Sequence, residues 1–239
     1  MEYPSSPLLA SVKKDDPMLH RLPLTISLCI MSAGMLAYAA DPLDPVFAHI
    51  DTAAKSFKGM AADITNTQHT ALVDSDEVQT GTIKLLRAKD GTHMLVVLKD
   101  AQSASIDSHE LKVYNSKTKT VDTWSLGSKQ NEVNQFLLLG FGASSTDLKA
   151  SYDVTYVGEE KVGSQQTSRI KLVPKSLETR RKMKQADLWF GQNGLVVQQK
   201  FLWAAGDSRL VTYSGMTLGS MPDKDLDLKL PKDVTVQKH

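Results

Sequence analysis

The residues that could do chemistry are few in this chain, and they do not form a catalytic pattern. The 239 residues include one cysteine, Cys29, and six histidines. The sequence contains no H-E-x-x-H zinc motif and no G-x-S-x-G nucleophile motif, and "GEEKVGS" lacks the lysine of a phosphate-binding loop. The histidines beyond residue 40, at positions 49, 69, 93, 109 and 239, show no metal-ligand spacing. We therefore expect neither an enzyme nor a cofactor, although a dispersed serine, lysine or carboxylate site stays open.

Charge and aromatic content argue against nucleic acid as a partner. The formal net charge is +1, and aromatic residues make up 6% of the chain. A nucleic-acid-binding face is strongly basic, and a site for single strands adds aromatic side chains on which bases stack. The basic residues of this chain do not cluster with its aromatic ones. We expect a protein that binds neither DNA nor RNA.

The single cysteine lies in a segment with the pattern of a secretory signal peptide. Residues 22–37 carry no charge and follow a basic flank, and a small-x-small triplet ends the run at residues 37–39. The run is short for a helix that must cross ~30 Å of hydrocarbon, although a retained N-terminal anchor stays the alternative. Leu28, which precedes Cys29, does not fit a lipoprotein signal. We expect residues 1–39 to be removed by cleavage after Ala39, which leaves an exported protein of 200 residues without cysteine.

Residues 40–239 are expected to form a single domain, since no linker or repeat divides them. An opening helix is predicted at about residues 45–57, where apolar residues recur at helical spacing after Pro45. Beyond it the apolar residues alternate, and turn signals such as Asp90-Gly91 and Asn193-Gly194 separate the runs. This pattern predicts about nine to eleven short strands in one large antiparallel sheet.

Helical insertions and one alternating acidic stretch complete the predicted elements. The insertions are at residues 129–142, 144–151 and 176–185. In the second of them Ser144 stands three residues before Asp147, as in a capping box. Residues 223–234 alternate acidic and apolar side chains, which favours an exposed edge strand over the alternative of a calcium site.

The apolar side of the predicted sheet is the first candidate for a binding site. A single antiparallel sheet buries one face and exposes the other to water. If the sheet curls into an open half-barrel, three helices are too few to fill it tightly, and an apolar hollow remains under them. The candidates for its lining are Ile83, Leu85, Leu111, Val113, Phe136, Ile170, Leu172, Leu188, Phe190, Phe201 and Trp203. The alternative is that the same residues form a packed core.

Arg87 is the second candidate, because it continues the parity of Ile83 and Leu85 on the predicted strand. An arginine there would project toward the hollow, where its charge is costly unless its donors are paired. The guanidinium group can engage several carbonyl oxygens at once, such as those that end a lid helix. We expect Arg87 to act as a latch for the lid. The alternative is that the strand ends at Leu86 and that Arg87 reaches water beside Lys89.

Six stretches, in order along residues 43–236, resemble those of the periplasmic outer-membrane lipoprotein carrier family, LolA. They are "SFKGMAADITNTQ", "GTIKLLR", "HELKVYNSKTKTVDTW", "IKLVPKS", "DLWFGQNGLVVQQKFLW" and "DLDLKLPKDVTV". The resemblance implies a mainly β protein with helices, folded as an open, unclosed antiparallel β-barrel with a helical lid over an apolar cavity. The family's strand-two arginine, which ties the lid to the barrel, falls on Arg87. The chain departs from the family in having Ala88 where a proline usually follows.

The function that this resemblance implies is lipoprotein transport without chemistry on the cargo. Such a carrier takes acylated lipoproteins from an inner-membrane ABC-type release complex to an outer-membrane acceptor, and it would act as a monomer. A sensor or regulatory module on the same fold, which binds lipid or lipoprotein, is the alternative. An enzyme on a β scaffold is a third hypothesis.

Overall fold

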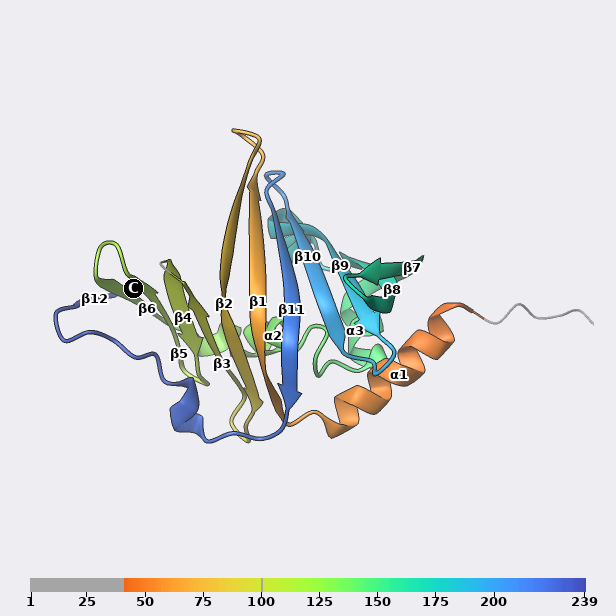
Figure 1. The fold of residues 1–239 in the computed structure, drawn as a ribbon, viewed down its shortest axis with the longest axis horizontal. Coiled ribbons are helices and arrows are strands. Elements are labelled where there is room, and N and C mark those ends of the chain that lie inside the picture. Colours follow the sequence, from red (N-terminus) through yellow and green to blue (C-terminus); the bar gives the residue numbers. More distant parts are fainter. Residues whose placement is uncertain (1–40, 100) are drawn as a thin grey trace, which may run out of the picture. The chain divides into compact units, whose positions relative to one another are not determined.

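The computed structural model describes residues 41–99 and 101–239. The predicted signal peptide at residues 1–39 lies outside the described residues. Twelve strands form one sheet in the order β12-β6-β5-β4-β3-β2-β1-β11-β10-β9-β8-β7 (Figure 1). The strands are β1 (Gly59–Thr70), β2 (Ser75–Arg87), β3 (Thr92–Leu98), β4 (Gln102–Ile106), β5 (Glu110–Asn115), β6 (Thr120–Ser125), β7 (Tyr152–Val162), β8 (Gln165–Pro174), β9 (Met183–Gly191), β10 (Val196–Trp203), β11 (Ser208–Leu218) and β12 (Thr235–Lys238).

The sheet is antiparallel and unclosed, as the sequence predicted. Its two edges, β12 and β7, do not pair with each other, and only the β12–β6 pair is parallel. The strand count exceeds the predicted nine to eleven, and one strand that the sequence pattern missed is β4. Its sequence, "QSASI", consists mostly of small or polar residues and gives a weak apolar alternation. The backbone pairing of β4 with β3 and β5 holds it in the sheet.

The helices occur near the positions that the sequence predicted. They are α1 (Leu43–Ser56), α2 (Gln130–Leu137), α3 (Ser145–Ser151), α4 (Leu177–Lys182) and the 3-10 helices η1 (Gly127–Lys129) and η2 (Asp223–Leu226). The first helix begins earlier than predicted, because the Asp41 carboxylate accepts a hydrogen bond from the backbone N–H of Leu43 at 2.9 Å. None of the helices among the described residues is long and apolar enough to cross a membrane.

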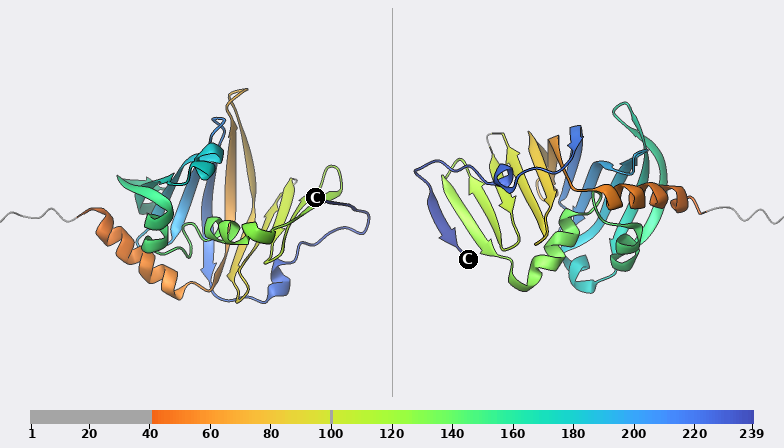
Figure 2. Two further views of the ribbon diagram at one scale, coloured as in Figure 1. Left: turned by 180° about the vertical axis from the view of Figure 1, so that it is seen from behind. Right: turned by 90° about the horizontal axis from the view of Figure 1, so that it is seen from below.

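The prediction of an edge strand at residues 223–234 is wrong. The stretch begins with η2 and continues without regular structure, and the strand β12 that follows it begins only at Thr235. Two contacts hold η2 against the sheet: Leu226 is buried, and Lys84 donates a hydrogen bond to the Asp225 carbonyl at 3.2 Å. The C-terminal segment therefore crosses one side of the sheet, and α2 lies on the other side (Figure 2).

Candidate functional site

The ten strand candidates for the hollow all project to one face of the sheet, which we call the inner face. Side chains of paired residues point to the same side of a sheet. The register carries this face outward from β2, since Ile83 pairs with Val96, Val96 with Ala104 and Ala104 with Val113. Toward the other edge of the sheet, Leu188 of β9 pairs with Ile170 of β8 in the same way. The alternation in the sequence was therefore sufficient to place these residues on a common face.

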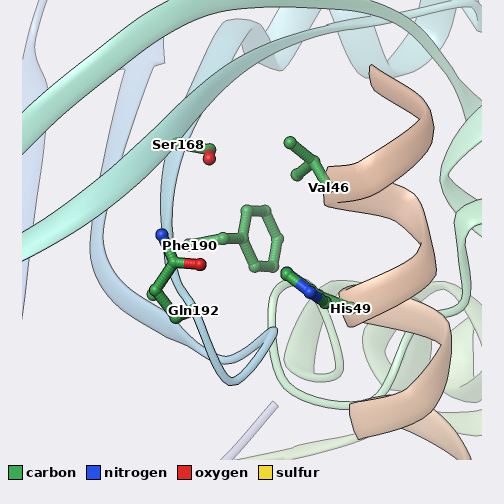
Figure 3. A pocket seen from close by; sticks show the side chains of 6 residues that line it. Val46, His49, Ser168, Phe190 and Gln192 are labelled. Atoms are coloured by element: carbon green, nitrogen blue, oxygen red, sulfur yellow. The ribbon is translucent and has the colours of Figure 1, made fainter. Parts of the chain in front are cut away.

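One part of the inner face is a packed core. Seven of the eleven candidates are buried there: Ile83, Leu85, Ile170, Leu172, Leu188, Phe190 and Phe201. Val46, Phe47 and Ile50 of α1 belong to the same cluster. Figure 3 shows Phe190 facing Val46 and His49, and the cavity between them measures about 10 Å³. That is room for about one water molecule, so this part of the face is filled by α1.

The other part of the inner face, which we call the open half, lies on β3–β6 beside α2. Leu111 and Val113 are half-buried there. The side chains of Phe136 and Trp124 keep 41% and 37% of their surface exposed. Leu137 of α2 is buried in a small separate cluster on this half of the sheet. The helix α2 is thus fastened to the open half by few apolar contacts, and apolar surface stays accessible beside it.

Phe136 also connects α2 to the far side of the inner face. Its ring is tilted against that of Phe201, with the centroids 5.2 Å apart. The ring of Phe201 in turn stacks on Trp203, with the centroids 6.0 Å apart. Trp203 is half-buried, so this aromatic row runs from the packed core to surface that is still partly accessible.

Arg87 joins two helical segments to the sheet. Its Nη1 donates to the carbonyl of Ala54, in the last turn of α1, at 3.0 Å. Its Nη2 donates to the carbonyl of Gly142, between α2 and α3. The guanidinium carbon also lies 5.7 Å from the centre of the Phe57 ring. The residue is exposed rather than buried, so its charge keeps contact with water while its donors are paired.

A second polar connection, which the sequence did not indicate, joins α1 to α3. The two carboxylate oxygens of Asp51 accept hydrogen bonds from the backbone N–H and the hydroxyl of Ser145, each at 2.7 Å. An acid at the first turn of a helix is favourable because the free N–H groups point toward it. The two residues are 94 positions apart, so no local pattern could have found them.

A third connection runs through the packed core. Gln199 of β10 donates from its side-chain amide to the carbonyl of Leu139, in the segment that follows α2. The Tyr213 hydroxyl donates to the Gln199 side-chain oxygen at 2.8 Å. Burial raises the pKa of Tyr213 well above its usual range, so the phenol stays protonated and remains a donor. These buried polar groups fix where the chain between α2 and α3 lies.

The helix α2 has polar contacts to the β2–β3 turn. The Asn134 side-chain oxygen accepts from the backbone N–H of Thr92 at 3.1 Å, and the Gln130 amide donates to the carbonyl of Asp90 at 3.0 Å. Within residues 41–99 and 101–239, no group of three or more potential ligands is placed to hold a metal ion. The arrangement is one of an accessible apolar surface whose covering helices are held at a few polar points.

The comparisons with known proteins give structural likenesses only. No family model matches the sequence, and no curated protein matches it. A solved structure of an uncharacterized conserved protein from Thermus thermophilus matches 81% of this chain and 97% of its own, with 10% identity and a TM-score of 0.49. The MucA/MucB complex of Pseudomonas aeruginosa matches 77% of this chain and 60% of that chain, with 12% identity and a TM-score of 0.43.

A LolA superfamily protein from Nitrosomonas europaea is also among the similar structures. The match covers 77% of this chain and 96% of that chain, with 12% identity and a TM-score of 0.37. At TM-scores below 0.5 these likenesses assign no ligand and no partner to this chain.

Proposed function

We propose that the protein is a periplasmic carrier that binds the acyl chains of lipoproteins on the open half of its inner face. The supporting observation is the accessible apolar surface beside α2, where Phe136 and Trp124 are exposed and Leu111 and Val113 are half-buried. Contiguous apolar surface on a monomer commonly marks a binding site. An aliphatic chain laid on this surface would cover it and extend the apolar contacts of α2.

The energetics of acyl chains explain why a carrier is needed. Burial contributes ~0.8 kcal/mol per CH₂ group, so a diacyl or triacyl anchor does not cross water unaided at a useful rate. The carrier must shield the anchor and then release it. A short helix held by Leu137 and by the Asn134–Thr92 hydrogen bond suits this task, because few contacts have to break before more apolar surface is uncovered.

The route of the cargo is part of the same proposal. The motifs that resemble the LolA family support loading by an inner-membrane ABC-type release complex and delivery to an outer-membrane acceptor. In this scheme the protein does no chemistry on the cargo. Arg87 acts as the latch, since it holds the end of α1 and the chain before α3 together.

Displacement of a fluorescent dye tests acyl binding. The purified protein should bind an environment-sensitive apolar dye, and an acylated peptide should displace it while the same peptide without its acyl chain does not. Val113→Glu should weaken displacement about tenfold or more, because a carboxylate on an apolar contact surface must be desolvated. Val97→Glu is the matched control, since Val97 is exposed on the opposite face. Equal displacement by both peptides, or equal loss in both variants, would contradict the proposal.

A separate experiment tests the transport role. Protein isolated from the periplasm should carry acylated peptides or lipid that mass spectrometry identifies, and loaded protein should pass them to outer-membrane vesicles. Acyl binding without transfer would support the proposed binding site and contradict the proposed transport role. In that case a sensor module on the same fold would describe the protein better.

A further inference from the structure

A second cavity lies on the face opposite the inner face, under the C-terminal segment. It measures about 510 Å³, within the range of small-molecule sites. The outward-facing side chains of β3–β5 form its floor, and residues 223–230 form its roof. Figure 2 shows that segment crossing the side of the sheet away from α2. Its polar lining includes Asp90, His93, Asp107, Lys112, Asp223 and Asp227.

The lining carries an excess of negative charge. Its one lysine, Lys112, is already paired with Glu110 at 3.0 Å and lies 4.0 Å from Asp107. A hydrogen bond from Ser108 lowers the pKa of Asp90. Burial raises the pKa of Asp107, but the backbone N–H groups of His109 and Glu110 outweigh it, so the net direction is downward. Both carboxylates are therefore ionised at neutral pH.

His93 is the buried titratable side chain of the lining, and it lies beside the acidic cluster. The residue is 8% exposed and lines the cavity, and its Nε2 atom is buried without a hydrogen-bond partner. Nε2 lies 3.3 Å from an Asp90 carboxylate oxygen, and Nδ1 lies 3.8 Å from one of Asp223. Among the described residues this is the one buried side-chain nitrogen or oxygen left unsatisfied. The nearest partner of Nε2 is the Asp90 carboxylate, which can only accept, so a bound donor group would not satisfy this atom.

Part of the lining is apolar. Leu226 is buried, and Leu228 and Leu230 extend this apolar part toward solvent. A bare metal ion fits this lining poorly, because no group of potential ligands in the described chain is placed to hold one. A ligand with a cationic head and an aliphatic stem fits both the carboxylates and the leucines.

We propose that this cavity binds an ammonium or guanidinium group carried on an aliphatic stem. The head would lie between Asp223 and Asp227, with the stem along Leu226. Two sources share this chemistry: a free aliphatic diamine, and a lysine or arginine side chain of a polypeptide. The site is on the face opposite the acyl-binding surface, so it stands or falls independently of the carrier proposal.

Isothermal titration calorimetry on the purified protein tests the proposal with 1,5-diaminopentane and with a blocked Gly-Lys-Gly peptide. Pentan-1-ol serves as the uncharged control. The double variant Asp223→Asn, Asp227→Asn should bind the cationic probes about tenfold or more weakly, since it removes charged hydrogen-bond acceptors. Each single variant, Asp223→Asn and Asp227→Asn, is compared with Asp225→Asn as the matched control, which lies in the same segment, likewise removes one charge and does not line the cavity. Asp225→Asn should change the affinity less than about twofold.

The outcomes separate the sources and can overturn the site. Binding of both probes supports recognition of the cationic group, binding of the diamine alone assigns a free amine, and binding of the peptide alone assigns a protein side chain. Amide chemical shifts should move at residues 90–93 and 223–230, and thermal melts should show that the variants remain folded. No binding of either probe, equal binding of pentan-1-ol, or equal weakening by Asp225→Asn would overturn the proposal.

Discussion

Arg87 shows why an arginine, and not a lysine, suits the junction of sheet and helices. Its two terminal nitrogens reach carbonyls that belong to separate segments, at Ala54 and Gly142. A lysine presents a single nitrogen and cannot bridge both positions with the same rigid geometry. Gly142 contributes as well, because a Cβ atom there would lie 2.4 Å from Nη2 of Arg87. The small residue leaves the space that the guanidinium group occupies.

We predict that Arg87→Leu lowers the free energy of unfolding by about 1–2 kcal/mol, at the low end for charged hydrogen bonds because the residue is exposed. Cargo transfer should fall further than this loss of stability explains. Arg87→Lys should be intermediate. Gly142→Ala should displace the guanidinium group. The loss of unfolding free energy caused by Gly142→Ala should therefore be smaller in the Arg87→Leu variant than in the wild type. Thermal melts beside a transfer assay measure both effects. Strictly additive losses, or unchanged transfer by well-folded Arg87→Leu, would remove Arg87 from the mechanism.

At the scale of elements, α3 begins with a complete capping box. The Asp147 N–H donates to the Ser144 hydroxyl oxygen at 3.1 Å, and an Asp147 carboxylate oxygen accepts from the Ser144 N–H at 2.9 Å. Hydrogen bonds from Ser144, aided by the charge of Arg87, lower the pKa of Asp147. The start of α3 is therefore sensitive to acid, and it adjoins Ser145, which Asp51 of α1 holds.

The sign of the pH dependence follows from this lowered pKa. A carboxyl group whose pKa is lower in the folded state stabilises the fold above its unfolded value of roughly 3.9, and the contribution is lost as the pH falls through the folded value. We predict that Asp147→Asn lowers the melting temperature at pH 7 and that the difference from wild type shrinks below about pH 4. Melts from pH 7 to pH 3 measure this. A difference that persists undiminished at pH 3 would show that the cap does not depend on ionisation.

Elements with local signals were predictable, and those defined by distant partners were not. Asp90-Gly91 and Asn193-Gly194 marked hairpins that the structure contains, because turn chemistry is local. The capping box at Ser144 was readable for the same reason. Residues 223–234 alternated like a strand, yet burial of Leu226 on the sheet formed a 3-10 helix instead. That choice depends on tertiary contact, which overrides the local pattern.

The same division applies to the candidate site. The face of each strand residue followed from alternation, which is why Leu85, Leu188 and Val113 share the inner face. Whether a residue on that face is packed or accessible depends on where the helices lie. That placement is set by contacts such as Asp51–Ser145 and Gln199–Leu139, which are distant in sequence. The sequence therefore predicted a lining without separating its two parts.

At the scale of the whole sheet, the packed and open parts divide two tasks. The strands β8–β10 with α1 contain the largest share of fully buried side chains, including Ile170, Leu172 and Leu188. The strands β3–β6 with α2 hold a small cluster around Leu137. Local opening free energies follow the density of buried apolar contacts. The packed part can keep the fold intact while α2, which covers the open half, changes position.

Hydrogen exchange measured along the chain tests this division. We predict slow exchange in β8–β10, where the backbone amides lie over the main core, and faster exchange in α2 and in β4–β6. An acylated peptide should then slow exchange in α2 and β3–β6 and leave β8–β10 unchanged, because the proposed acyl-binding surface lies on the open half. The same peptide without its acyl chain is the control. Protection that appears first in β8 and β9 would mean that α1 moves away on binding and that the packed core is itself the acyl site. Uniform exchange without ligand would mean that the sheet opens as one unit, and the two-part division would then fail even if acyl binding were observed.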